Sequence, residues 1–210
     1  MTDKEKALVV IEKLKKVYPD AKCSLKYDTP IQFLIAIRLS AQCTDNRVNL
    51  VTPSLFSRFK KTEDFASANP EEVAKYIYSC GFYRTKSSDI VNMCKIIVDK
   101  FNGKIPGNME ELTSLPGIGR KTANLFLGEV YDKPGIVVDT HFIRITSRLG
   151  FHDIKDAEKI ERIMGKLIPK EEMLSFCHRI VAHGRAVCTA KSPMCSACCL
   201  KLECNCLNNN

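Results

Sequence analysis

The sequence predicts an all-α fold. Apolar residues recur at helical spacing along nearly the whole chain. Several segments also begin and end with the residues that typically cap helices. The only strand-like run, residues 135–138, is too short and too isolated to build a sheet. We therefore expect helices and loops throughout.

The first helix is predicted over residues 4–17. Its apolar face is expected to consist of Leu8, Ile11, Leu14 and Val17. The apolar stretch 31–39 is interrupted only by Gln32 and Arg38, which predicts a helix buried in the core.

Residues 69–72, Asn-Pro-Glu-Glu, are a strong helix start, because they combine a capping side chain, a proline in the first turn and two carboxylates near the positive helix end. Gly81 is a plausible end for this helix, and Gly103 for a second one over 86–101. Further helices are predicted at 109–114, 120–131, 140–149, 156–168 and 171–184. Asn208–Asn210 are expected to be disordered.

The composition is that of a globular protein with 210 residues and a formal charge of +8. A basic excess makes an anionic partner plausible, although it says nothing about the fold. The N-terminus lacks the layout of a secretory signal, and no apolar run approaches the ~20 residues of a membrane span. We expect a cytoplasmic, nucleoid-associated protein without membrane contact, as a monomer.

The chain has eleven cysteines, and six of them lie between Cys188 and Cys206. The other five are scattered and are interpreted as small buried apolar residues. Disulfides are disfavoured in a reducing cytosol, so the cluster points to metal binding or catalysis.

Residues 115–121, Leu-Pro-Gly-Ile-Gly-Arg-Lys, lie between two short helical patterns. Two glycines one residue apart permit a tight turn, and Ile118 between them can point inward. The following helix would present its positive N-terminal end beside the turn, where a phosphate can bind without any base being read. A simple helix–turn–helix corner is the alternative.

The heptapeptide resembles the helix–hairpin–helix motif of the endonuclease III superfamily of DNA glycosylases. Residues 137–141, Val-Val-Asp-Thr-His, are similar to a further signature of that family. The similarity also includes residues 39–45 and 80–86 and the terminal cysteines, so it covers essentially the whole chain. The resemblance implies two all-α domains with a cleft between them. These would be a six-helix barrel at 22–133 and a discontinuous iron–sulfur domain at 1–21 and 134–210.

The resemblance makes Lys121 the nucleophile and Asp139 the catalytic carboxylate. Breaking a base–sugar bond builds positive charge on the sugar, which a carboxylate stabilises. A deprotonated amine can attack C1′ to form a Schiff base, from which the 3′ phosphate is lost by β-elimination. A solvated lysine and a helix N-cap are the purely structural alternatives for Lys121 and Asp139.

A lysine at position 121 implies a bifunctional enzyme, a glycosylase with lyase activity at abasic sites. The expected substrates are oxidised or ring-saturated pyrimidines in double-stranded DNA, and abasic sites. A glycosylase for mismatched thymine or uracil, and a non-catalytic DNA-binding protein, are the competing interpretations.

The same resemblance assigns DNA contacts outside the catalytic pair. Gln42 would fill the space left by a flipped base, and Phe82 would be the apolar wedge opposite it. The alternative for Phe82 is packing in the core beside Tyr83. The remaining expected contacts are Leu115, Gly117, Gly119, Arg120 and Lys191.

The spacing Cys188-x6-Cys195-x2-Cys198-x5-Cys204 matches that family's pattern for a 4Fe-4S cluster. Zinc also accepts four thiolates and is the alternative metal. Cys199 and Cys206 are surplus, and either could replace a neighbouring ligand.

Overall fold

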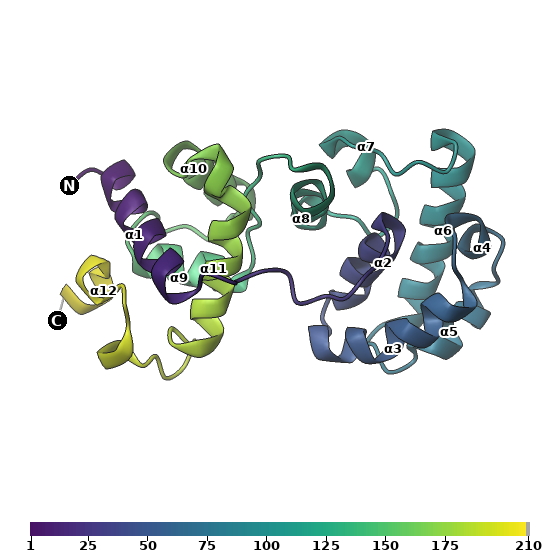
Figure 1. The fold of residues 1–210 in the computed structure, drawn as a ribbon, viewed down its shortest axis with the longest axis horizontal. Helices are drawn as coiled ribbons and strands as arrows, with labels where there is room; N and C mark the ends of the chain where they lie inside the picture. Colours follow the sequence, from purple (N-terminus) through teal and green to yellow (C-terminus); the bar gives the residue numbers. More distant parts are fainter. Residues whose placement is uncertain (209–210) are drawn as a thin grey trace. The chain divides into compact units, whose positions relative to one another are not determined.

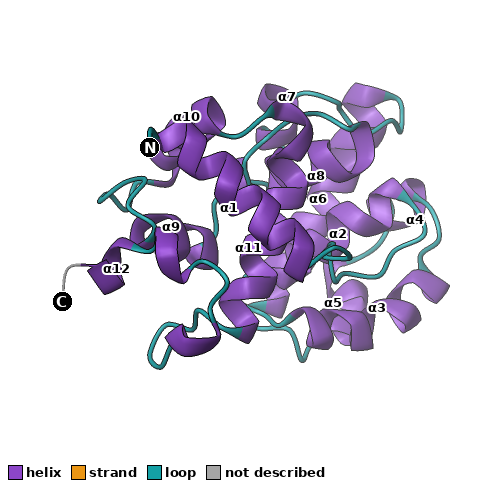
Figure 2. Cartoon of the chain, turned by 60° about the vertical axis from the view of Figure 1, so that its left-hand side comes forward, coloured by secondary structure: helices purple, strands orange, loops and turns teal. Residues whose placement is uncertain are grey.

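The structure is a computed structural model that describes residues 1–208. It contains helices and loops and no strand within that range, which confirms the all-α prediction (Figure 2). The chain forms two compact units, Ser24–Tyr131 and a second unit made of Met1–Cys23 and the residues from Asp132 onward. None of the helices formed by residues 1–208 has both the length and the apolar character that a membrane crossing requires.

The unit Ser24–Tyr131 is built around one buried helix. Helix α2 (Pro30–Ser40) is apolar on almost all sides, and it contacts α3, α6 and α8 (Figure 1). The other helices of this unit are α3 (Asp45–Arg58), α4 (Thr62–Ala66), α5 (Pro70–Ile77), α6 (Tyr83–Phe101), α7 (Met109–Thr113) and α8 (Arg120–Tyr131).

Helix α3 has no counterpart among the predicted helices. Pro53 lies inside it, and a proline in the middle of a segment normally indicates a break. The helix nevertheless begins at a standard cap, since the Thr44 side chain accepts a hydrogen bond from the Arg47 backbone N–H. It buries Val48, Thr52 and Leu55. Tertiary burial therefore outweighs the local proline signal.

The second unit contains α1 (Asp3–Val17), α9 (Thr140–Arg148), α10 (Ala157–Leu167) and α11 (Met173–Ala186). Helix α11 packs against both α1 and α9. Three 3₁₀ turns, Lys170–Glu172, Cys195–Ala197 and Lys201–Glu203, and the short α12 (Asn205–Asn208) complete it. Asn208 ends α12; Asn209 and Asn210, also expected to be disordered, lie outside the described residues.

The buried face of α1 differs from the predicted one. Ile11 and Leu14 are buried as expected, whereas Leu8 and Val17 are exposed. The buried face consists of Ala7, Val10, Ile11 and Leu14. These positions also follow helical spacing, and they include the small side chain of Ala7.

Candidate functional site

The predicted hairpin joins α7 to α8 through a turn that excludes side chains at one position. Leu115 and Ile118 are buried, and the Ile118 N–H donates to the Leu115 carbonyl at 3.1 Å. Gly117 has a φ of +75°, in the left-handed region. A Cβ there would lie 2.2 Å from Nε of Arg38. Only glycine fits.

The turn rests on an ion pair between two other helices. Arg38 of α2 donates to Oδ2 of Asp89 on α6 from Nε at 3.0 Å and from Nη2 at 2.5 Å. A Cβ at Gly117 would also approach Asp89 Oδ2 to 2.9 Å. The hairpin is thus packed onto α2 and α6. A Cβ at Gly119, by contrast, would meet nothing within 4 Å, so its backbone is open to an approaching ligand.

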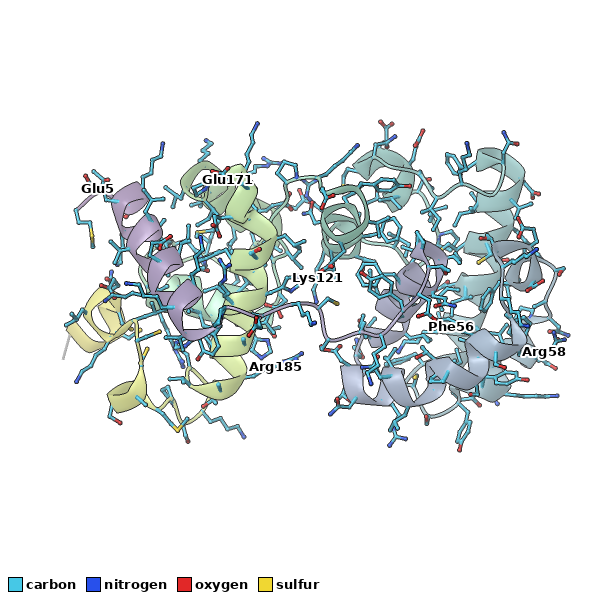
Figure 3. The ribbon with its side chains drawn as sticks, viewed as in Figure 1. Glu5, Phe56, Arg58, Lys121, Glu171 and Arg185 are labelled. Atoms are coloured by element: carbon cyan, nitrogen blue, oxygen red, sulfur yellow. The ribbon has the colours of Figure 1, made fainter. Side chains whose placement is uncertain are left out.

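Lys121 lies in the first turn of α8, directly after the hairpin. Its side chain is exposed, and it can be followed at the start of that helix in Figure 3. Arg120 before it is exposed as well. The helix start places positive partial charge beside both cations, which favours an anion there. A ligand can reach the Lys121 amine, as a nucleophile requires. Because the side chain is exposed, a bound ligand would have to displace the water around it.

Gln42 and Phe82 lie in neighbouring turns of the same unit. A Cβ built on Gly81 would lie 3.6 Å from the Gln42 carbonyl oxygen. Gln42 has a φ of 53° and Phe82 a φ of 58°, a conformation that costs energy for residues with side chains. Phe82 is 67% exposed, so the alternative that it packs in the core is wrong. The apolar side chain of Phe82 and the amide of Gln42 are both exposed, so a ligand can reach each of them.

Asp139 caps α9, as its sequence context predicted. Its Oδ1 accepts from the Phe142 N–H at 2.7 Å. Its Oδ2 lies 3.2 Å from Nδ1 of His141. The preceding segment is also fixed, because the Val137 N–H donates to Sγ of Cys177 at 3.2 Å. The carboxylate is therefore held on both oxygens and by the chain that leads to it.

His141 contacts Asp139 and was not singled out from the sequence. Its ring fits against α11 because residue 184 is glycine. A Cβ at Gly184 would lie 2.8 Å from Cδ2 of His141. The usable signal was its position two residues after a capping aspartate, from which a ring nitrogen can reach the carboxylate.

Five of the six clustered cysteines line one cavity of about 290 Å³. Its other walls are mostly apolar side chains. The lining residues are Arg148, Val187, Cys188, Pro193, Met194, Cys195, Cys198, Cys204 and Cys206. Cys199 is absent from this lining, and it lies among Tyr18, Lys13 and Glu203 instead. All four predicted ligands therefore face the same space.

Polar groups surround these sulfurs. Arg148 Nη1 lies 3.1 Å from Sγ of Cys188, where its positive charge suits a thiolate. His183 Nε2 lies 3.4 Å from Sγ of Cys198, while Tyr18 Oη contacts the other ring nitrogen at 3.1 Å. Burial raises the pKa of Cys198 to about 11, which favours its protonated form.

Within residues 1–208, no three His, Cys, Asp or Glu side chains converge closely enough to hold a single metal ion. Lys191 is exposed in the loop between Cys188 and Cys195, as is Arg185 at the end of α11. That loop is tied to α9, because Arg148 donates to the carbonyl oxygens of Thr189 and Ala190 at 2.9 and 3.1 Å.

Comparisons with known proteins agree with this layout. Residues 35–170 match the model of the HhH-GPD superfamily of base excision DNA repair proteins. The chain belongs to this superfamily. Endonuclease III of Synechocystis is 46% identical over 196 residues, which cover 93% of this chain and 90% of that protein. Endonuclease III of Escherichia coli is 34% identical, and the match covers 96% of each chain.

Solved structures with a similar fold agree with this result. A non-covalent endonuclease III–DNA complex superposes with a TM-score of 0.94 at 39% identity and covers 100% of this chain and 98% of that one. A trapped endonuclease III–DNA covalent intermediate has the same TM-score and identity, and it covers 100% of this chain and 99% of that one. A thermostable thymine-DNA glycosylase has a TM-score of 0.90 at 18% identity, covering 98% of each chain, which shows a shared fold only.

The two glycines of the hairpin should respond differently to the same change. Gly117→Ala forces a side chain into the left-handed region and against Arg38, so we expect it to cost about 1–2 kcal/mol and to lower Tm by roughly 2–8 °C. Gly119→Ala should leave Tm nearly unchanged, because its Cβ would meet nothing within 4 Å. It should weaken binding to duplex DNA, because the added methyl group would occupy space through which a ligand approaches the backbone. Calorimetry and fluorescence anisotropy measure the two effects. Equal Tm values for the two variants would contradict this assignment.

Proposed function

We propose that this chain is a base-excision repair enzyme that removes oxidised or ring-saturated pyrimidines from duplex DNA and then cleaves the strand at the abasic site. One observation carries the proposal. An exposed lysine stands at a helix start behind a turn that only glycine fits, in a chain 46% identical to an endonuclease III over nearly its whole length. The solved thermostable thymine-DNA glycosylase shares the fold, but at 18% identity this similarity does not support a shared substrate.

In the proposed reaction, the deprotonated Lys121 amine attacks C1′ of the damaged nucleotide. The bond between C1′ and the base breaks, and the base leaves with the bonding electrons. The new bond between Nζ and C1′ becomes a Schiff base after the sugar ring opens. Loss of a proton from C2′ then expels the 3′ phosphate by β-elimination. The exposure of Lys121 fits this role, because the amine must reach a carbon of the ligand.

Asp139 is proposed to stabilise the positive charge that develops on the sugar. A carboxylate is effective when it is already oriented, because no reorganisation is then needed during the reaction. The Phe142 N–H and His141 supply that orientation. Lys121 and Asp139 belong to different units of the chain, and we propose that they act on the same nucleotide of bound DNA.

The remaining predicted residues are proposed to hold and open the duplex. Backbone N–H groups of the hairpin would bind one phosphate without reading sequence, and Arg120 would add charge. Gln42 and Phe82 would enter the stack where the base has left. The contacts that complete this proposed set are Leu115, Gly117, Gly119 and Lys191.

We also propose that Cys188, Cys195, Cys198 and Cys204 hold a 4Fe-4S cluster. The residues fit the group, since these thiols line one cavity whose other walls are mostly apolar, with Arg148 beside one sulfur. Once bound, the cluster would cross-link a C-terminal segment that, as far as Asn208, otherwise has only short 3₁₀ turns and one four-residue helix after α11. Its proposed contribution is structural.

Lys121→Arg tests the nucleophile. Arginine keeps the positive charge for DNA binding, but its guanidinium does not form a Schiff base. We expect borohydride to trap the unmodified protein on duplexes with oxidised pyrimidine or an abasic site, and to trap the variant on neither. DNA affinity should change by no more than a few-fold. Trapping only on mismatched thymine or uracil would replace the proposed lesion class, and strand cleavage by the variant would refute the nucleophile.

Asp139→Asn separates charge from capping. Asparagine caps helices about as well as aspartate, so Tm should hold, whereas Asp139→Ala should lose about 1 kcal/mol of stability. Single-turnover base excision by Asp139→Asn should fall by about 10²-fold or more, because the neutral amide does not stabilise the sugar cation. An Asn variant as active as the unmodified protein would remove Asp139 from the mechanism.

The cluster predicts a brown protein with absorption near ~400 nm and about four irons per chain. Cys188→Ser or Cys204→Ser should diminish this absorption. Cys199→Ser is the matched control and should keep it, because Cys199 does not line the cavity. A colourless protein with one zinc per chain would show that zinc occupies the site instead.

A further inference from the structure

Two cysteines outside the C-terminal cluster lie directly beneath the turns that carry Gln42 and Phe82. Cys43 follows Gln42, and Cys80 comes two residues before Phe82. The Cys43 and Cys80 thiols interact electrostatically. Their backbones are close as well, because the ideal Cβ of Gly81 is only 3.6 Å from the Gln42 carbonyl oxygen. Both residues belong to the unit Ser24–Tyr131.

Each cysteine is anchored at the end of a helix. The Cys43 N–H donates to the Ser40 carbonyl at 3.1 Å, just after α2. The Cys80 N–H donates to the Ile77 carbonyl at 2.8 Å, just after α5. The two cysteines therefore follow two separate helix ends whose turns approach each other next to the pair.

The surroundings favour a stepwise reaction of the pair. Cys80 is completely buried, and Cys43 is partly exposed, so an oxidant in solution meets Cys43 first. Burial raises the pKa of Cys80 to about 11, which keeps it a thiol until its partner is activated. The buried amine of Lys86 donates to the Leu39 carbonyl at 2.8 Å, and together with Arg47 it supplies positive charge near the sulfurs.

We propose that Cys43 and Cys80 are an oxidative modification site, at which a small disulfide such as oxidised glutathione converts the dithiol into an intramolecular disulfide. The Cys43 thiolate attacks one sulfur of the reagent, which forms a mixed disulfide and releases one thiolate. Cys80 loses its proton and attacks the Cys43 sulfur, which expels the second thiolate. Overall, two protein thiols are oxidised to one disulfide, and one reagent disulfide is reduced to two thiols.

A Cys43–Cys80 disulfide would change the turns that carry Gln42 and Phe82, because it brings the two sulfurs closer together. Disulfide-bonded sulfurs lie about 2.05 Å apart, which is closer than the sulfurs of two separate thiols approach. One helix end has to move to close this difference. Gln42 and Phe82 are adjacent to it and already have left-handed backbones. We expect the disulfide to slow base excision at least fivefold, an effect that rests on the proposed function.

The experiment incubates the full-length protein with oxidised glutathione and maps disulfides by peptide mass spectrometry. Single-turnover excision and the absorption near ~400 nm are followed in parallel, so that damage to a metal site is recognised. We expect a Cys43–Cys80 linked peptide, excision slowed at least fivefold, and full recovery with dithiothreitol. Cys43→Ala should keep its starting activity in oxidised glutathione, because it removes the thiol that reacts first. Cys23→Ser, which removes a thiol from the other unit, should respond like the unmodified protein.

Absence of the linked peptide, or a linked peptide with unchanged excision, would overturn the inference. Equal slowing of the Cys43→Ala variant would do so too, because another thiol would then be responsible. The linked peptide is detected without any activity assay. A protein that forms the disulfide but excises no lesion in the reduced state would therefore refute the proposed function and leave the modification site standing.

Discussion

The close contact of Gly117 with the Arg38–Asp89 ion pair determines how the helices around it are held. Because residue 117 lacks a side chain, the hairpin can lie against an ion pair that already joins α2 to α6. The start of α8 is thereby fixed relative to the most buried helix of its unit. Lys121 and Arg120 sit on that first turn, so their exposure follows from packing several residues earlier.

A comparable constraint operates around Asp139. Gly184 lets α9 come close to α11, and the His141 ring then reaches the Asp139 carboxylate. Arg144 uses the same proximity, since its guanidinium donates to the carbonyls of Gly184 and Cys188 at 3.0–3.3 Å. The contact that orients the proposed catalytic carboxylate therefore also anchors the segment with the first proposed cluster ligand. Substitutions in the loop between Cys188 and Cys195 should therefore affect the packing of α9.

Two of the four non-glycine residues with a left-handed backbone among residues 1–208 are at the positions proposed to probe DNA. Gln42 and Phe82 both adopt this conformation without being glycine, which the surrounding packing has to sustain. The Cys43–Cys80 pair lies directly behind them. A single bond between two sulfurs would therefore act on residues that have little conformational freedom to adapt.

The sequence alone determined the all-α class, the hairpin at 115–121, the N-cap role of Asp139 and the family, because these depend on local periodicity, capping and short motifs. It did not reveal α3, whose internal Pro53 is offset by burial, or the true buried face of α1. Only the tertiary structure showed Phe82 exposed, His141 on Asp139 and Cys43 beside Cys80. Each of these depends on which side chain faces which neighbour, and helical periodicity fixes a face without naming the group that packs against it.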